Sequence, residues 1–221
     1  MSKSIIIFGK GPSVLKCTRD IVDQYDDIAI CNYPVLNDFF LNLIKNRHIN
    51  YHFANCGSVD KRYTNKVNKL LNIKKVLNTN KGVNNYNKYL INLDILKENI
   101  HLTSIKYFKE KYNLNPSGGT MAIKYILDTK LYNKICLVGY DNFQIGKPVY
   151  YFKPNEYNSA LKYLFINDTF TKEGNMNICS GHDPKKTFKY YTDVIENNPD
   201  IQFIFITDIQ FNKFYNNLTI K

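Results

Sequence analysis

The chain of 221 residues contains no tryptophan, and it lacks the features that mark several common protein classes. Its apolar runs stay well below the roughly 18 residues that a membrane-spanning helix needs. Its five cysteines include no C-x-x-C pair, and an odd number of cysteines without an export signal favours reduced thiols in a cytoplasmic protein. The sequence also has no D-x-D motif, no G-K-[ST] phosphate loop and no G-x-S-x-G elbow. These absences argue against a membrane-embedded protein, a zinc ribbon and a serine hydrolase of the elbow type.

Arginine is scarce, since Arg19, Arg47 and Arg62 are the only three, and lysine supplies most of a net charge of +11. A dedicated nucleic-acid binder usually carries more arginine, for bidentate contacts with bases and phosphates. Lysine, asparagine, isoleucine and tyrosine are abundant together, as in proteins of AT-rich genomes, so part of the charge is compositional. We therefore expect no nucleic-acid partner, and the charge favours an anionic substrate or weak peripheral contact with a membrane surface.

Short apolar runs alternate with stretches of helical periodicity along the chain. The apolar runs predict strands at 4–8, 27–31, 50–54, 74–78, 134–138 and 201–206. The patterns between them predict helices at 13–24, 36–46, 58–72, 103–112, 118–129, 156–166 and 184–197. Such alternation is typical of an α/β protein with a mostly parallel sheet and helices on both faces. The length suits a single Rossmann-like domain over 1–221. The polar stretch 168–181 is a candidate lid, with an ordinary surface connection as the alternative.

The turn after the first expected strand is the most informative motif. The run 5–8 (IIIF) leads into 9–13 (GKGPS). The two glycines permit positive φ and a close approach of a ligand to the backbone, and Ser13 is placed to cap the next helix. Free N–H groups at such a helix start attract a phosphate or another anion. The pattern is not a complete G-x-G-x-x-G, so an ordinary structural turn is the alternative.

Polar and glycine residues also follow the other expected strands, at the edge where parallel sheets bind ligands. Asn32 follows the second strand, Asn55 follows the third, and 139–141 (GYD) follows the strand that ends at Val138. A helix start at 117–119 (SGG) is expected at the same edge. Ser117 can cap that helix, while the glycines leave room for a ribose or a planar ring, or simply permit tight helix packing.

His182 is the candidate general base of this edge. It precedes a helix expected to begin at Pro184, and a helix start favours the neutral imidazole that accepts a proton. The alternative is a structural histidine. Nearby aromatic side chains can donate hydroxyl hydrogen bonds to a departing phosphate or can pack in a core. This aromatic set comprises Tyr140, Phe143, Tyr150, Tyr151 and Phe152.

Taken in order, these motifs resemble the bacterial sialyltransferases of glycosyltransferase family 42, and more distantly the animal sialyltransferases. The resemblance is carried by 6–13, 30–32, 54–57, 117–118, 135–141 with Gln144 and Gly146, 150–152 and 180–182. The stretch 61–113 matches the family poorly. The resemblance implies an inverting, metal-independent enzyme that needs no cofactor. Such an enzyme moves sialic acid from CMP-sialic acid to a glycan hydroxyl.

The resemblance also implies roles for individual residues. His182 would remove the acceptor proton, Tyr150 would hydrogen-bond the leaving phosphate, and the segment 168–181 would close over the donor. The residues expected to line the donor are Gly9, Lys10, Gly11, Pro12, Ser13, Asn32, Asn55, Ser117, Gly118, Gly119, Gly139, Asp141 and Phe143. The implied partners are the nucleotide-sugar donor, a glycan acceptor and, by analogy with the family, further copies of the same chain.

The chain departs from the family pattern at three places. Phe143 stands where the family has its second phosphate tyrosine, Leu114 stands about where an arginine is expected, and Lys10 replaces an asparagine. Lys10 could itself meet a phosphate. Three alternatives stay open: a CMP-sugar-binding protein or donor hydrolase with weak transfer, a transferase for another CMP-nonulosonate such as CMP-Kdo, and an NAD-dependent oxidoreductase. Asn32 disfavours the last, because an acidic ribose ligand is expected there.

Overall fold

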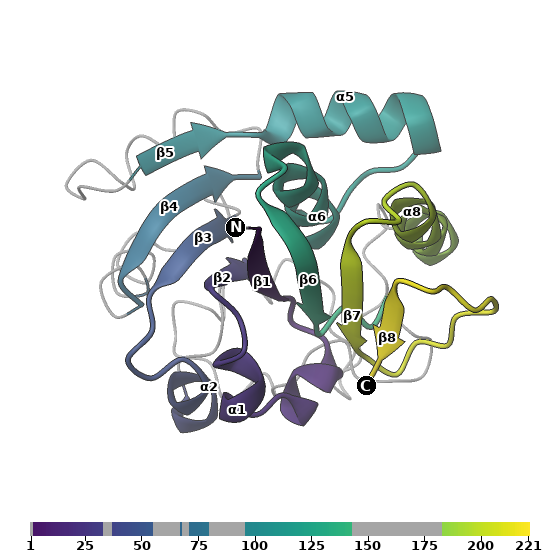
Figure 1. Cartoon of the computed structure of the whole chain (residues 1–221). Helices are drawn as coiled ribbons and strands as arrows, with labels where there is room; N and C mark the ends of the chain where they lie inside the picture. The colour runs from purple at the N-terminus through teal and green to yellow at the C-terminus, as the bar shows by residue number, and fades with distance from the viewer. Residues whose placement is uncertain (1, 33–36, 55–66, 68–70, 80–95, 143–182) are drawn as a thin grey trace, which may run out of the picture.

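The computed structural model describes residues 2–32, 37–54, 67, 71–79, 96–142 and 183–221. One open sheet of eight parallel strands runs through them in the order β5-β4-β3-β2-β1-β6-β7-β8, which is the expected Rossmann-like α/β architecture (Figure 1). The strands are β1 (Lys3–Phe8), β2 (Asp27–Cys31), β3 (Ile49–Ala54), β4 (Ile73–Asn78), β5 (Leu96–Asn99), β6 (Tyr132–Val138), β7 (Gln202–Ile206) and β8 (Leu218–Ile220).

Helices cover both faces of this sheet (Figure 1). One face carries the 3₁₀ helix η1 (Pro12–Lys16), α1 (Arg19–Val22) and α2 (Asp38–Leu43), and the other carries α5 (His101–Tyr112), α6 (Gly118–Thr129) and α8 (Pro184–Glu196). Side chains alternate along β1: Ile6 and Phe8 pack on the first face, while Ile5 and Ile7 pack on the second. The central strands are thus buried on both faces, which explains their almost continuous apolar sequence.

Most of the predicted elements are present. All six predicted strands are confirmed, and α6 has the same bounds as its prediction. The single helix predicted at 13–24 is wrong, because the chain is extended at Cys17 and Thr18 between η1 and α1. The short edge strands β5 and β8 were not predicted. The predicted helix at 58–72 lies mostly outside the described residues, and the one at 156–166 lies wholly outside them.

The path of the chain creates a switch point beside β1. From β1 the strands follow one another outward to β5, and β6 then pairs on the opposite side of β1. Ile7 consequently has Ala29 of β2 as its neighbour on one side and Leu137 of β6 on the other. In open parallel sheets a ligand binds outside the carboxyl ends of the strands at such a point. The fold therefore directs attention to the turns after β1, β2 and β6.

Aromatic rings hold α8 against α5. The Tyr190 ring centroid lies 4.8 Å from that of Phe108 and 5.4 Å from that of Tyr112, both in edge-to-face geometry. Tyr190 is buried, and its hydroxyl has no hydrogen-bond partner in the described part of the chain. Burial raises the pKa of this phenol well above its ordinary value, so the hydroxyl keeps its proton.

Candidate functional site

The carboxyl ends of the eight strands lie at one edge of the sheet, because every strand pair is parallel. At the switch point the turn after β1 lies directly against the turn after β6. The predicted site residues that meet there are Gly9, Lys10, Gly11, Pro12 and Ser13 from the first turn, and Gly139 and Asp141 from the second.

Glycines allow the backbones of these two turns to touch. The Gly9 N–H donates to the Val138 carbonyl at 2.7 Å, and the Gly11 N–H donates to the Gly139 carbonyl at 2.9 Å. A Cβ at Gly9 or at Gly11 would lie 2.6 or 2.7 Å from the Gly139 oxygen. The predicted positive φ in the first turn is wrong, since Gly11 has a φ of −65° and Gly139, in the second turn, has the positive φ of +74°. The glycines of the first turn allow its backbone to contact the backbone of the turn after β6.

The predicted capping role of Ser13 is also wrong. The cap position of η1 is Gly11, and no side chain caps this helix. Ser13 is buried, its hydroxyl donates to the Ile206 carbonyl at 2.8 Å, and its N–H donates to Asp141 Oδ2 at 2.9 Å. The other carboxylate oxygen of Asp141 accepts from the Thr207 hydroxyl at 2.8 Å. Asp141 therefore ties together the ends of β1, β6 and β7.

These contacts change what the first turn can bind. The N–H groups of Gly9, Gly11, Ser13 and Val14 all donate to atoms of the protein. The group that the Ser13 N–H meets is the carboxylate of Asp141, an anion that the protein itself supplies. These four N–H groups are therefore not free, and the anion that the Ser13 N–H meets belongs to the protein; binding of a donor phosphate by this turn stays a prediction.

A second cluster of predicted residues lies where β2 meets the start of α6. Asn32 has a φ of 57°, a left-handed conformation that asparagine tolerates. Its N–H donates to the Phe53 carbonyl at 2.7 Å, and its own carbonyl lies 2.6 Å from Nε2 of the buried His52. Because a carbonyl only accepts, that nitrogen carries the hydrogen. His52 thus holds the turn of Asn32 from the neighbouring strand.

The side chain of Asn32 faces the first turn of α6. A Cβ on Gly118 would lie 3.4 Å from Asn32 Oδ1, an ordinary van der Waals distance, so the start of α6 lies directly beside this amide. The cap predicted at Ser117 is confirmed, since its hydroxyl oxygen accepts from the Thr120 N–H at 3.2 Å. Asn32, Ser117 and Gly118 therefore form one polar group at the β2 end of the site.

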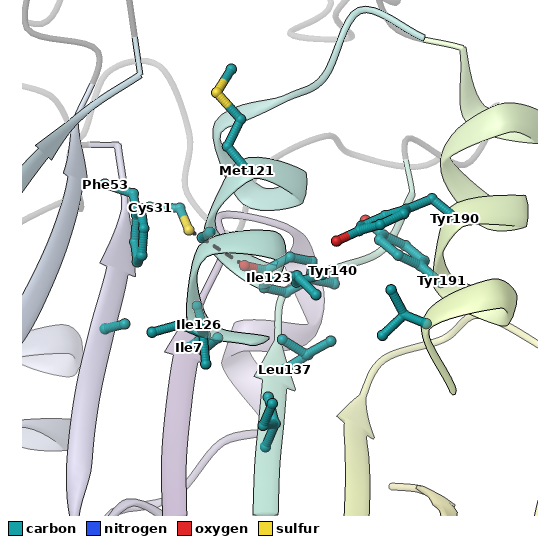
Figure 2. Close-up of a cluster of buried hydrophobic side chains, with 14 of the residues drawn as sticks. Ile7, Cys31, Phe53, Met121, Ile123, Ile126, Leu137, Tyr140, Tyr190 and Tyr191 are labelled. Carbon is teal, nitrogen blue, oxygen red and sulfur yellow. Dashed lines mark hydrogen bonds between the residues drawn. The ribbon is translucent and has the colours of Figure 1, made fainter. Parts of the chain in front are cut away.

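Gly119 has a packing role beside this group. A Cβ there would lie 3.0 Å from Cε1 of Tyr140, and the Tyr140 hydroxyl lies 3.4 Å both from the Gly119 carbonyl and from Cys31 Sγ. Figure 2 shows this hydroxyl pointing toward Cys31 within the apolar cluster, with Tyr191 on the other side of the ring. Burial raises the pKa of Tyr140 well above its ordinary value. For Tyr140, core packing is thus the correct one of the two predicted alternatives.

Four of the predicted site residues lie outside the described residues, as does the candidate lid 168–181. The residues are Asn55, Phe143, Tyr150 and His182, and Tyr151 and Phe152 of the aromatic set also lie there. Their roles stay predictions.

The described chain resumes at the start of α8, next to the switch point. Asp183 caps α8 by accepting from the Lys186 N–H at 3.1 Å, and Pro184 is its first residue. The amide of Asn142, which follows Asp141, donates to the Pro184 carbonyl at 2.9 Å. The turn after β6 therefore fixes the start of α8, two residues beyond His182. Asn142 was not predicted as a site residue, although its place directly after Asp141 was a usable signal.

The described residues contain no group of three or more histidine, cysteine, aspartate or glutamate side chains that could hold a metal ion. None of the helices in the described ranges is long and apolar enough to cross a membrane.

The sequence matches no protein-family model and no curated protein. Solved structures resemble it. The chain has a sialyltransferase-like fold. It aligns to a variant of the sialyltransferase Cst-II in complex with CMP, with a TM-score of 0.65 and 17% identity over 92% of this chain and 81% of that one. It also aligns to CstII from Campylobacter jejuni in complex with the substrate analogue cytidine-5'-monophosphate, with a TM-score of 0.61 and 16% identity over 93% and 80% of the two chains. Monomeric CstII gives a TM-score of 0.62 and 16% identity over 92% and 81%.

Proposed function

We propose that the protein is a CMP-sugar-dependent glycosyltransferase of the sialyltransferase type, which transfers sialic acid with inversion and without a metal. One observation carries this proposal: a likeness over 92% of the chain to a sialyltransferase structure that contains CMP. The described residues add a site of fitting chemistry at the switch point, where Asn32, Ser117 and Gly118 form a polar group beside the β1 turn. The fold and the site together favour a nucleotide donor at this edge of the sheet.

The proposed reaction makes one bond and breaks another at the anomeric carbon of the donor sugar. The oxygen of an acceptor hydroxyl bonds to that carbon from one face, and the bond to the phosphate oxygen breaks on the opposite face. CMP leaves with the electron pair, and His182 takes the proton of the attacking hydroxyl as general base. Tyr150 donates a hydrogen bond to the departing phosphate, where negative charge develops. Because CMP leaves as a phosphate monoester, hydroxyl, amide and ammonium groups can meet its charge.

A binding experiment without metal tests the nucleotide. In buffer with EDTA, CMP at 100 times its Kd stabilises the folded chain by about 2.7 kcal/mol, which for a chain of this size raises Tm by about 5–10 °C. UMP, GDP and NAD at equal concentration shift Tm less. Stabilisation by NAD alone would instead identify an oxidoreductase.

A product assay then separates the remaining alternatives. The protein is incubated with CMP-sialic acid or CMP-Kdo and a mixed glycan panel, and the products are read by mass spectrometry. A glycan heavier by one sialic acid residue supports the proposal. Transfer from CMP-Kdo but not from CMP-sialic acid would identify the protein as a transferase for a different CMP-sugar. Free sialic acid without a modified glycan indicates a hydrolase, while binding without turnover indicates a CMP-sugar-binding protein.

A further inference from the structure

Asn32, the first residue after β2, has a backbone conformation that few residues adopt. Its φ of 57° lies in the left-handed region, which is sparsely populated for residues other than glycine. Two successive residues of β3 hold it there. The Asn32 N–H donates to the Phe53 carbonyl at 2.7 Å, and His52 Nε2 donates to the Asn32 carbonyl at 2.6 Å. Both backbone groups of Asn32 are thus fixed from the neighbouring strand.

The left-handed turn moves the Asn32 side chain from one face of the sheet to the other. Along β2, Ile30 packs on the face of η1, α1 and α2, and Cys31 packs on the face of α5, α6 and α8. Side chains alternate in a regular strand, so an extended residue 32 would again point to the face of Ile30. Instead, the Asn32 amide oxygen lies 3.4 Å from the place of a Cβ on Gly118, the first residue of α6. The conformation of residue 32 therefore decides where this amide lies.

His52 is a polar residue at a position that suits an apolar one. It is fully buried, and its neighbours on the adjacent strands are Ile30 of β2 and Val76 of β4, which both belong to the same apolar cluster. Burying an imidazole among such side chains costs free energy, and a hydrogen bond offsets part of that cost. Packing alone gives no reason for a histidine here, whereas the contact of its ring N–H with Asn32 gives one.

We propose that His52 is a positioning residue of the donor site. Its Nε2–H keeps Asn32 in the left-handed conformation, which places the Asn32 amide on the α6 side of the sheet. This inference rests on the proposed function, in which Asn32 lines the donor. His52 itself contacts neither substrate. It raises the fraction of molecules whose Asn32 amide is already in place, and the apparent affinity for a donor is proportional to that fraction.

Calorimetric titration with CMP tests this role. His52→Leu removes the ring N–H and suits the apolar cluster, and we expect about 3- to 10-fold weaker CMP binding, the loss that corresponds to one ordinary hydrogen bond. His52→Gln carries an N–H close to the position of Nε2 and recovers most of the affinity.

His101→Leu is the matched control for His52→Leu. His101 is also buried, and its Nδ1 donates to the carbonyl of Thr79 at 2.8 Å, directly after β4 and two strands away from β2. The control removes the same kind of hydrogen bond and loses stability. Its affinity for CMP changes by less than about twofold, because distant sites act independently.

A double-mutant cycle separates positioning from stability. Asn32→Gly removes the amide, and glycine adopts a left-handed φ without help. In that background His52→Leu has no amide to position, so it changes CMP affinity by less than about twofold. A histidine that served only the stability of the sheet would weaken CMP binding by the same factor in both backgrounds. Urea denaturation of each variant checks that it is folded.

Proton NMR of the wild-type protein gives a readout that does not depend on His52→Leu. The ring N–H of a buried, hydrogen-bonded histidine gives a downfield signal, and the signal of His52 is assigned by its disappearance in His52→Gln. This signal moves when CMP binds, because the carbonyl that it meets belongs to the residue in contact with the ligand. The ring N–H signal of His101 keeps its position.

The outcomes separate the two proposals. Failure of the wild-type protein to bind CMP contradicts the proposed function itself. If the wild type binds CMP, three results would each leave the function standing and make the role of His52 wrong. They are unchanged affinity in His52→Leu, no recovery in His52→Gln, and a His52 signal that does not move at saturating CMP.

Discussion

Asp141 Oδ2 accepts a hydrogen bond from the backbone N–H of Ser13 at 2.9 Å, across 128 positions of sequence. The same carboxylate also accepts from the hydroxyl of Thr207. One side chain thus joins the carboxyl ends of three adjacent strands, at the point where the fold directs a ligand. In the described structure this carboxylate fixes the first turn.

Replacing Asp141 tests this architectural role. Asp141→Ala leaves the Ser13 N–H and the Thr207 hydroxyl without their acceptor, and we expect a loss of about 2–4 kcal/mol in the free energy of unfolding. Asp141→Asn retains an acceptor for Ser13 and a donor for Thr207, so it loses less. Urea denaturation measures both, and equal losses in the two variants would contradict the assignment.

Gly11 is required by the close contact of the two turns. A Cβ at this position would lie 2.2 Å from Asp141 Oδ2, so Gly11→Ala must displace the carboxylate and is expected to lose about 1–3 kcal/mol of stability. Gly118→Ala is the matched control, because its Cβ meets nothing closer than 3.4 Å and alanine favours a helix. Its Tm stays the same or rises, while CMP binding weakens if the space beside Asn32 admits the donor. If the Gly11→Ala and Gly118→Ala proteins are equally stable, the contact of residue 11 with Asp141 does not require a glycine.

The buried hydroxyl of Tyr190 is expected to cost stability. It has no partner in the described part of the chain, so Tyr190→Phe removes an unsatisfied group and raises the free energy of unfolding by about 1 kcal/mol. Tyr140→Phe provides the comparison, since the Tyr140 hydroxyl contacts Cys31 and the Gly119 carbonyl. That change is neutral or destabilising. A destabilised Tyr190→Phe protein would show that the Tyr190 hydroxyl has a partner.

His182→Ala tests the proposed general base. Loss of a general base lowers the transfer rate by about 10²–10⁴-fold, while the affinity for CMP stays within a few-fold. His48→Ala is the control, since His48 directly precedes β3 at the opposite edge of the sheet. Rates come from single-turnover product analysis. Unchanged turnover in His182→Ala assigns that histidine a structural role.

Phe143→Tyr tests the alignment of the aromatic set. A hydroxyl at this position adds a donor near the departing phosphate, so transfer from CMP-sialic acid stays equal or increases up to about tenfold. The kcat of the variant measures the effect, with thermal unfolding as the check on folding. A tenfold loss of kcat in a stable variant means that Phe143 does not occupy the place of the phosphate tyrosine.

The positions of the six central strands could be predicted because each depends on a local run of apolar residues. Runs such as Ile5-Ile6-Ile7-Phe8 are apolar on both faces, as central parallel strands must be, and Ser117 gives α6 its cap. The edge strands β5 and β8 carry no such pattern. They are short and partly polar, and they extend mainly because β4 and β7 offer open hydrogen-bonding edges.

The details of the site depended on contacts that sequence spacing does not reveal. Ser13 reads as a helix cap, yet its N–H and hydroxyl bond to Asp141 and Ile206, which lie far away in the chain. Asn32 and Gly118 were each predicted as site residues, but only the fold shows that they face each other.

The central place of β1 has a consequence for synthesis. Ile5 pairs with Asp27 on one side and with Ile135 on the other, so the second neighbour of this strand leaves the ribosome long after the first. A nascent chain that stops short of Tyr132 presents one unpaired edge of a strongly apolar strand. Such edges recruit strands from other molecules. We therefore expect nascent chains that stop or pause before β6 to aggregate through the unpaired edge of β1.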